Sequence, residues 1–441
     1  MKNIVIGAGP SGRLAGLELG RLGEETILIE KKSLGGTCLN EGCMVICALT
    51  DIARFLNNSH TYENLGLIKG NIEISYSEIV KKIKETQKII HKIDHEENTS
   101  QNNHIIYGEA EIINNQVVVN GESLDYKNLL IATGANPFNP NIKGIEHSIN
   151  NKDILKLKKI PEKLNIIGGS IIAAEVSNIY SSLGSEVNII ARSEFLKELD
   201  AEVKEYIIKK MLKNVKIHEN TETLEIKREK TIIKSKTHGG EISEIEGIAF
   251  IATGRSPNSK IAKNILKSDE FDKKGAIIVN KMMQTKIKNV YAAGDVIGGI
   301  NLTPIARMEG IIAARNMAGY SSKIEYNCIP QSINLDMPIS FVRTSKKAND
   351  INDKTKDILI PGSVGPESFW KVLGKETGMT KASFNEKNEL LKSITAISPS
   401  SISDIAYLSY LMRIGENITN FDDFIEVHPS TDVFFHIMKY I

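Results

Sequence analysis

Short apolar stretches bounded by glycine and polar residues recur along the chain, and this pattern predicts buried strands. The stretch NIVIGAGPSG at residues 3–12 passes from an apolar strand through a glycine turn into a helix, and LNIIGGSIIAAE at 164–175 repeats this order. Each is followed by a second strand, which we expect to end at Glu30 in the first case and at Arg192 in the second. Alternating strands and helices of this kind predict two α/β units with parallel sheets.

A second repeat indicates that one of these units is inserted in the other. LLIATGANP at 129–137 and AFIATGRSP at 249–257 share a strand that leads into Ala-Thr-Gly. The stretch KLKKIPEKL at 156–164 is predicted to be the linker into the inserted unit.

The composition changes near residue 324, and the C-terminal residues beyond this point are typical of antiparallel strands separated by turn residues. A helix is predicted from Ser401 to Arg413, because Ile405, Leu408 and Met412 fall on one stripe. The polar segments 81–103 and 345–357 are predicted to be a solvated helix and a loop, respectively.

The charge balance argues for a small-molecule partner. The 441 residues include 55 basic and 54 acidic side chains, a net charge of +1, so nothing favours nucleic acid or an anionic membrane surface. The chain begins MKNIVIGAGPSG, without a secretory signal, and holds no apolar run long enough to span a membrane. We therefore expect a cytoplasmic protein, in which clustered cysteines are more often catalytic, redox-active or metal-binding than structural.

The first glycine turn predicts a dinucleotide site. Gly7, Gly9 and Gly12 form G-x-G-x-x-G directly after a predicted strand. These positions provide a tight turn, a backbone close to a pyrophosphate and close packing of helix on strand. Glu30, at the end of the next strand, is placed to accept a hydrogen bond from a ribose hydroxyl.

The second glycine turn departs from this pattern. Gly168, Ser170 and Ala173 occupy its three positions, so a serine replaces the central glycine. Arg192, rather than an acid, stands at the end of the following strand. An arginine there favours a 2′-phosphate, and hence NADP over NAD.

Three of the four cysteines lie in one stretch, GGTCLNEGCMVIC, as Cys38, Cys43 and Cys47. The start of a helix lowers the pKa of a thiol, which suits thiol–disulfide exchange. Two alternatives remain open from the residues alone: reduced, inert thiols, and a soft-metal site built from all three cysteines. The spacing is unusual for structural zinc and no histidine is near in sequence, so we expect no metal site.

The stretch GGTCLNEGC, with GAGPSG upstream and AAGD downstream, resembles the FAD-dependent pyridine nucleotide–disulfide oxidoreductases over essentially the whole chain. Dihydrolipoamide dehydrogenase, glutathione reductase and mercuric reductase belong to that family. The resemblance implies two Rossmann-like domains and an α+β C-terminal dimerisation domain. Its expected ranges are 1–143 and 259–323 for the FAD domain, 144–258 for the inserted NAD(P) domain, and 324–441 for the dimerisation domain.

The resemblance also implies a mechanism, in which NAD(P)H reduces FAD, FAD reduces a Cys38–Cys43 disulfide, and the dithiol exchanges with a substrate disulfide. It makes Cys43 the thiol on the flavin side and Cys38 the thiol that meets the substrate. The substrate is a small-molecule or protein-bound disulfide. The cofactor contacts that it implies, beyond those of the two glycine turns and of Glu30 and Arg192, fall on Gly36, Thr37, Ala110, Thr133, Gly134, Glu175, Gly254, Asp295 and Thr303.

Cys47 is a departure from the family pattern, because it replaces a lysine expected beside the flavin. Glu175 matches the glutamate that commonly pairs with that lysine. Loss of the cation should raise the pKa of this carboxyl unless another partner compensates. Cys47 itself is predicted to be a plain buried apolar thiol, with a third redox thiol as the alternative.

The stretch HPST brings a second departure. His428 matches the family's acid–base histidine, which completes the active site of the partner subunit in a homodimer. The glutamate that orients it is replaced by Val433, and Asp432 and Glu426 are the acids that stand near.

The sequence therefore predicts a homodimeric, dihydrolipoamide dehydrogenase-like disulfide oxidoreductase. Two alternatives are a flavoprotein oxidase, diaphorase or metal-ion reductase, and a non-catalytic FAD redox sensor. Mercury is disfavoured as a substrate, because the last cysteine is Cys328 and the C-terminus holds none.

Overall fold

The computed structural model describes residues 1–101, 103–235, 240–344, 354–361, 373, 378–387 and 390–416. They belong to two compact units, each assembled from segments far apart in the sequence. The first unit contains Met1–Ala48, Ser75–Lys159 and Ile251–Glu325, and the second contains Leu49–Ile74, Ile160–Phe250 and the described residues from Tyr326 on. The four domain ranges expected from the sequence divide the chain differently and stay a prediction.

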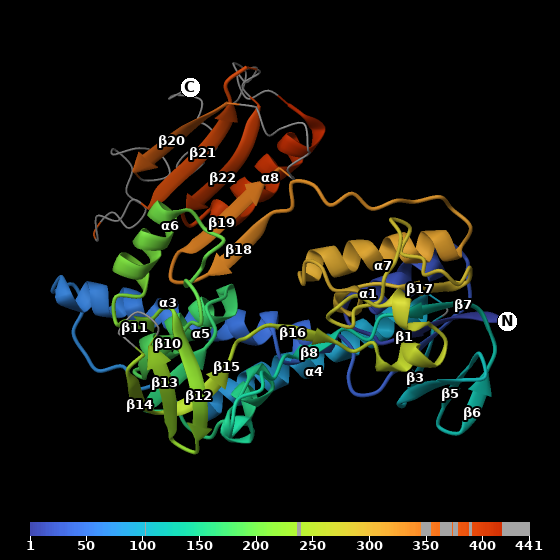
Figure 1. The fold of residues 1–441 in the computed structure, drawn as a ribbon, viewed down its shortest axis with the longest axis horizontal. Helices are drawn as coiled ribbons and strands as arrows, with labels where there is room; N and C mark the ends of the chain where they lie inside the picture. Colours follow the sequence, from blue (N-terminus) through green and yellow to red (C-terminus); the bar gives the residue numbers. More distant parts are fainter. Residues whose placement is uncertain are drawn as a thin grey trace. The chain divides into compact units, whose positions relative to one another are not determined.

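A parallel sheet forms the centre of the first unit, in the strand order β17-β7-β1-β2-β3. Figure 1 labels β1, β3, β7 and β17 of this sheet. All of its pairings are parallel, as the alternation of strands and helices predicts. Its strands are β1 (Lys2–Ile6), β2 (Thr26–Glu30), β3 (Asn103–Tyr107), β7 (Tyr126–Ile131) and β17 (Val290–Ala292).

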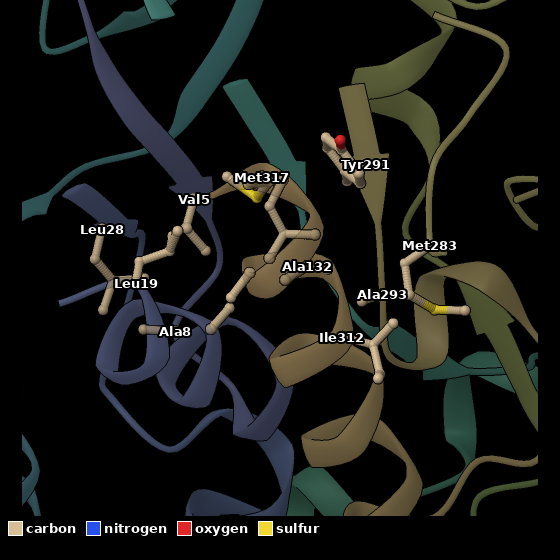
Figure 2. Close-up of a cluster of buried hydrophobic side chains, with 14 of the residues drawn as sticks. Val5, Ala8, Leu19, Leu28, Ala132, Met283, Tyr291, Ala293, Ile312 and Met317 are labelled. Atoms are coloured by element: carbon tan, nitrogen blue, oxygen red, sulfur yellow. The ribbon is translucent and has the colours of Figure 1, made fainter. Parts of the chain in front are cut away.

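Both faces of this sheet are buried, which is typical of parallel sheets. Val5 joins the hydrophobic cluster formed with α1 (Pro10–Arg21) and α7 (Thr303–Met317), and Figure 2 shows this cluster. Ile4 and Ile6, whose side chains point to the other face, join a cluster with β4 (Ala110–Ile113) and β5 (Gln116–Val119). The helices α1 and α7 approach closely, because a Cβ at Gly310 would lie 2.1 Å from the Ser11 carbonyl oxygen.

The first unit also contains elements outside this sheet. Helix α4 confirms the helix predicted within 81–103. The elements are α2 (Gly36–Asn40), the beginning of α3 (Cys43–Asn64), α4 (Tyr76–Ser100), β6 (Glu122–Leu124), and the antiparallel pair β8 (Ala135–Pro137) and β16 (Arg255–Pro257).

The second unit contains a four-stranded sheet in the order β11-β10-β9-β15. Its strands are β9 (Lys163–Ile167), β10 (Glu186–Ile190), β11 (Val215–His218) and β15 (Ile248–Ile251), and α5 (Ile171–Ser182) packs on them. Strand β10 ends at Ile190, so the prediction that it reaches Arg192 was two residues too long. The antiparallel strands β12 (Thr221–Lys227), β13 (Lys230–Ser235) and β14 (Ile242–Glu246) form a separate sheet.

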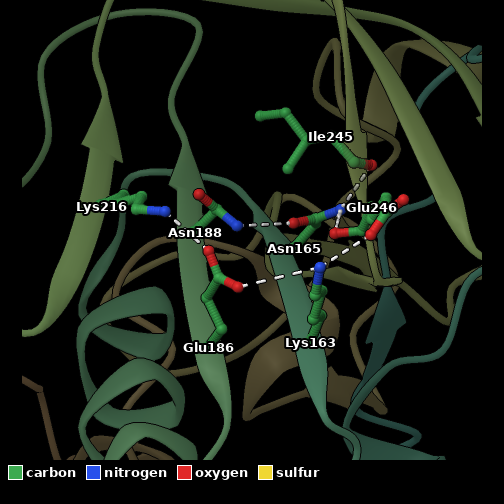
Figure 3. A network of polar contacts seen from close by, with 7 residues as sticks. All are labelled: Lys163, Asn165, Glu186, Asn188, Lys216, Ile245 and Glu246. Atoms are coloured by element: carbon green, nitrogen blue, oxygen red, sulfur yellow. Dashed lines mark hydrogen bonds and ion pairs between the residues drawn. The ribbon is translucent and has the colours of Figure 1, made fainter.

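Buried amides join these two sheets (Figure 3). Asn165 on β9 is fully buried and donates to the Thr231 hydroxyl at 3.2 Å, the Ile245 carbonyl at 3.2 Å and the Glu246 carbonyl at 3.1 Å. Its own oxygen accepts a bond of 3.1 Å from Asn188 on β10. The amide of Asn165 is therefore satisfied at both ends, as a buried polar group requires.

The C-terminal part of the second unit is an antiparallel sheet in the order β18-β19-β22-β21-β20. Helix α8 (Ser401–Ile414) packs on it through Ile405, Leu408 and Met412, which confirms the predicted stripe. The strands are β18 (Gln331–Asn334), β19 (Pro338–Arg343), β20 (Thr355–Pro361), β21 (Met379–Asn385) and β22 (Leu391–Ile397), and α6 (Ala201–Tyr206) lies earlier in the same unit. Because β20 begins at Thr355, the loop predicted over 345–357 was wrong for its last three residues.

The fold class expected from the sequence is thus confirmed: two Rossmann-like α/β arrangements and an α+β C-terminal part. Within the described residues, no helix combines the length and the apolar composition needed to cross a membrane.

Replacing Asn165 by alanine should destabilise the protein by about 2–3 kcal/mol, since the change leaves buried partners without a hydrogen bond. Urea unfolding would measure this loss. Lys163→Gln is the matched control on the same strand, because it breaks only exposed ion pairs, with Glu246 at 2.7 Å and Glu186 at 4.0 Å, which are together worth about 0–1 kcal/mol. Equal losses in the two variants would contradict a structural role for the amide network.

A second stability prediction concerns Glu18 on α1, which binds Arg21 and, across the helix interface, Arg315 on α7 at 2.7 Å. The hydrogen bond from Arg21, aided by Arg315 and opposed by burial, lowers the pKa of Glu18 from 4.5 to about 2. The resulting stabilisation is present above pH 4.5 and is lost as the pH falls toward 2.

We expect the free energy of unfolding to fall by about 1–2 kcal/mol over this pH range. The loss is no larger because both arginines are substantially exposed, so solvent screens their charges. Urea unfolding of the parent and of Glu18→Gln, near pH 6 and near pH 3, would measure it. The variant should lose less stability on acidification than the parent. Glu25→Gln, which removes an exposed partner of Lys2, should behave like the parent.

Candidate functional site

The turn between β1 and α1 is open to an anion. Gly7 has a φ of 100°, and a Cβ there would lie 2.4 Å from the Ala132 carbonyl oxygen, so only glycine fits. No side chain caps α1, whose first turn follows Gly9. A helix N-terminus of this kind binds phosphate through its backbone N–H groups and its dipole.

The surroundings of this turn fit a dinucleotide. Glu30 accepts backbone N–H bonds of 2.8 Å from both Ala8 and Lys32, which hold its carboxylate at the end of β2. The Ser11 hydroxyl, in the first turn of α1, is buried and has no hydrogen-bond partner in the described structure. A fixed carboxylate suits a ribose hydroxyl, and an unpartnered buried hydroxyl indicates that a further polar group belongs nearby.

The cysteines stand on two consecutive helices. Cys38 is the third residue of α2, and Cys43 is the first residue of α3. All four cysteines lie in the described part of the chain and none forms a disulfide there; Cys38 is half-buried, whereas Cys43 and Cys47 are exposed. The prediction that Cys47 is buried was therefore wrong. The Cys43 sulfur lies 3.6 Å from the hydroxyl oxygen of Thr303, the first residue of α7.

The two thiols of this pair share one charge. A hydrogen bond with Cys38 lowers the pKa of Cys43 to about 6, helped by Thr303 and Arg255 and opposed by burial. The same hydrogen bond, together with burial, raises the pKa of Cys38. Near neutral pH the pair therefore holds a thiolate on Cys43 and a proton on Cys38, as suits a dithiol that undergoes exchange.

Arg255 was missed by the sequence analysis, although it follows the second Ala-Thr-Gly directly. Its guanidinium pairs with Asp295 at 3.1 Å and donates to the Ala135 carbonyl at 2.6 Å and to the Thr37 hydroxyl at 3.5 Å. Burial raises the pKa of Asp295, and the charge of Arg255 acts against this rise. Two predicted cofactor residues, Thr37 and Asp295, are thus linked by one cation.

Helix α4 supports the cysteine loop from the side. The buried Gln87 donates to the carbonyls of Leu39 and Asn40 at the end of α2, at 2.9 and 3.2 Å. The Asn40 amide donates to the carbonyls of Leu34 and Gly36, so its oxygen faces His91, whose Nε2 lies 2.8 Å away. Because that oxygen can only accept, His91 must carry a hydrogen on Nε2.

The second glycine turn has the same open geometry in the second unit. Gly168 has a φ of 137°, and Ser170 stands exposed at the start of α5 without capping it through its side chain. Arg192 is exposed just beyond β10, on the same edge of the sheet.

Glu175 has a different partner from the lysine of the family pattern. Its carboxylate accepts the Asn334 backbone N–H at 2.8 Å. Arg54 binds the same segment, through the Asn334 side-chain oxygen at 2.7 Å and the Leu335 carbonyl at 2.8 Å. A backbone N–H therefore contacts the Glu175 carboxylate, and Cys47 occupies the position where the family pattern has a lysine.

Four further residues that are predicted to contact a cofactor lie in the first unit. Thr133 donates from its hydroxyl to the Asn258 carbonyl at 2.8 Å, Gly134 accepts from the Asn258 N–H, and Gly254 accepts from the Phe138 N–H. Ala110 is the first residue of β4.

His428, Asp432, Val433 and Glu426 lie outside the described residues. No cluster of metal-binding side chains occurs among the residues that the structure describes.

A helix start open to an anion, together with two neighbouring thiols, is typical of oxidoreductases that use a dinucleotide and a redox-active cysteine pair. The family model of the pyridine nucleotide-disulphide oxidoreductases matches residues 1–310, and the chain belongs to this family. The family is FAD-dependent, uses pyridine nucleotides as reductants, and consists of homodimeric disulfide reductases.

Curated relatives match along most of the chain. An uncharacterised protein of Methanocaldococcus jannaschii is 33% identical over 99% of this chain and 97% of its own. Dihydrolipoyl dehydrogenase of Buchnera aphidicola subsp. Schizaphis graminum is 30% identical over 97% and 92%. Mercuric reductase of Lysinibacillus sphaericus is 29% identical over 85% and 70%.

A solved structure shows the same fold. The Cu(II) complex of the HOCl-induced flavoprotein disulfide reductase RclA from Escherichia coli matches with a TM-score of 0.87 and 22% identity, over 100% of this chain and 99% of that one.

The support from α4 yields a prediction. His91→Leu removes the donor to Asn40, so α2 should loosen and its hydrogen bond from Cys38 to Cys43 should weaken. The pKa of Cys43, about 6 in the parent, should then rise by about one unit. The pH dependence of Cys43 alkylation by iodoacetamide measures this value. His91→Gln, which keeps an N–H donor, should stay close to the parent, and an unchanged pKa in the leucine variant would show that α2 does not depend on His91.

Proposed function

We propose that this protein is a dihydrolipoamide dehydrogenase-like NAD(P)H:disulfide oxidoreductase that uses Cys38 and Cys43 as its redox pair. The observation that carries this proposal is the placement of the two thiols at the starts of consecutive helices, with the Cys43 sulfur 3.6 Å from the Thr303 hydroxyl; the lowered pKa of Cys43 agrees with it. A pair of inert thiols has no need of this arrangement.

FAD would be held in the first unit. The glycine turn of Gly7, Gly9 and Gly12 would bind its pyrophosphate, and Glu30 its ribose. When bound, FAD accepts a hydride from NAD(P)H and delivers the electron pair to a disulfide. The other residues assigned to this cofactor are Gly36, Thr37, Ala110, Thr133, Gly134, Asp295 and Thr303.

The dithiol would reduce its substrate by two exchange steps. Cys38 loses its proton and attacks one sulfur of the substrate disulfide, which releases the first thiolate. Cys43 then attacks the Cys38 sulfur, releases the second thiolate and closes the Cys38–Cys43 disulfide. Each released thiolate takes up one proton, so the substrate gains two electrons and two protons.

The nicotinamide cofactor would bind at the second glycine turn. The open start of α5 at Gly168 and Ser170 supports a pyrophosphate site, and the exposed Arg192 favours NADPH over NADH. Glu175 and Gly254 are the remaining residues that are predicted to contact a cofactor. His428, supplied by a second copy of the chain, would remove and return protons at Cys38.

A second candidate is an oxidase or diaphorase that passes electrons to oxygen, a quinone or a metal ion. Cys47, exposed one turn after Cys43, motivates it, because this chain places a thiol where the family pattern has a cation. A redox sensor without turnover is the third alternative.

Anaerobic two-electron reduction of the purified flavoprotein, followed by visible absorbance, tests the proposal. A thiolate on Cys43 against oxidised flavin should give a long-wavelength band that is lost as the pH falls through about 6, because protonation removes the charge. Cys43→Ser should abolish the band, Cys38→Ser should show it before reduction, and Cys47→Ser should keep it. Direct bleaching of the flavin without this band in the parent would favour the oxidase or sensor.

A further inference from the structure

Arg307 is placed on the side of α7 that faces the cysteine pair. It follows Thr303 by one helical turn, so the two side chains share a face of the helix. The Thr303 hydroxyl oxygen is 3.6 Å from the Cys43 sulfur, which turns this face toward the pair. Consistent with this, the charge of Arg307 opposes the rise in the pKa of Cys38 that Cys43 and burial cause.

Within the described part of the first unit, Arg307 is also the one arginine whose side chain forms no ion pair. Of the five arginines in that unit, Arg13 pairs with Asp94 and Glu97, Arg21 and Arg315 pair with Glu18, and Arg255 pairs with Asp295. Arg307 is exposed and makes no hydrogen bond or ion pair among the described residues. Its five N–H donors are therefore available to a ligand.

Asp94, whose pKa the charge of Arg307 acts to lower, is already paired with another arginine. The residue is 7% exposed, and its carboxylate lies 3.1 Å from the Arg13 guanidinium. Burial raises the pKa of Asp94, and Arg13 and Arg307 oppose that rise. The buried carboxylate thus belongs to Arg13, whereas the Arg307 guanidinium faces solvent, where it can bind a carboxylate in a bidentate manner.

We propose that Arg307 selects disulfide substrates that carry a carboxylate near the disulfide bond. This inference rests on the proposed function, because it takes Cys38 as the thiol that attacks the substrate. A carboxylate held by Arg307 places the substrate disulfide beside Cys38. The charge also raises the local concentration of anionic substrates around the thiol.

A pair of chromogenic disulfides tests this selection: dithiodipyridine, which is neutral, and its dicarboxylate analogue dithiodinicotinate. The full-length protein is reduced, freed of reductant and mixed with each reagent under single-turnover conditions. The readout is each variant's rate with the anionic reagent divided by its own rate with the neutral one. Arg307→Gln should lower this ratio about three- to tenfold, the effect of one near, solvated charge.

Matched variants separate charge from packing. Arg307→Lys keeps the charge and should retain most of the ratio, whereas Arg307→Glu should lower it further than glutamine does. Lys323→Gln makes the same change in net charge beyond the other end of α7 and should leave the ratio as in the parent. Added salt should reduce the parent's ratio toward that of Arg307→Gln.

A readout that needs neither flavin nor a disulfide substrate is alkylation of Cys38 by iodoacetate and by iodoacetamide. In a Cys43→Ser, Cys47→Ser background, the two remaining thiols are Cys38 and the buried Cys328. Peptide mass identifies which of them is modified. Arg307→Gln should lower the ratio of the iodoacetate rate to the iodoacetamide rate.

The outcomes distinguish the two proposals. If both chromogenic reagents convert the dithiol to a Cys38–Cys43 disulfide and the ratio is equal in the parent and Arg307→Gln, the assignment of Arg307 is wrong and the proposed function stands. If Arg307→Gln lowers the rates with both reagents by the same factor, the assignment of Arg307 is also wrong, because the residue then acts through packing and not through its charge. If neither reagent forms the disulfide, the proposed function fails, and the assignment of Arg307 fails with it.

Discussion

The site depends on a direct backbone contact between the first glycine turn and the loop that carries the cysteines. The Gly35 N–H donates to the Ala8 carbonyl at 2.9 Å. A Cβ at Gly36 would lie 2.7 Å from the Cα of Gly9, so a side chain there would push the two segments apart. Since the helix start that can bind pyrophosphate and the helix that carries Cys38 touch through main-chain atoms, the distance between the nucleotide and the thiols is set by the backbone.

Charge at the site is balanced by residues that come from different parts of the chain. Arg255 neutralises the half-buried Asp295 and also favours the thiolate of Cys43. Arg13 likewise pairs with the buried Asp94. The family pattern would place a lysine at position 47, but this chain has a thiol there, and Glu175 instead contacts the backbone N–H of Asn334. A carboxylate that is taken out of water requires such donors, so the substitution at Cys47 is compatible with the fold.

Much of this site could be predicted from sequence because its parts are local. The glycine turn, Glu30 and the cysteine pair each lie within a short segment whose spacing reports its geometry, and the structure brings Gly9, Gly36 and Cys38 into one region. The supporting residues could not be found in this way. Gln87 and His91 lie more than 40 positions after the loop that they hold, and Arg255 lies more than 200 positions after Thr37. Their pairing follows from the packing of α4 and β16, which hydrophobic periodicity does not encode. The two boundary errors, at Arg192 and at Thr355, fell where strand ends meet polar residues, and there hydrogen bonding to neighbouring strands decides.

Helix α7 separates two tasks that an exchange reaction requires. Thr303, at its first position, lies 3.6 Å from the Cys43 sulfur, and Arg307, one turn later on the same face, is the residue that we propose acts on substrates approaching Cys38. A change at position 303 therefore acts on the chemistry of the pair, whereas a change at position 307 acts on which molecules approach it. Because both positions lie on one rigid helix that is packed against α1, the recognition residue can vary without moving the thiolate.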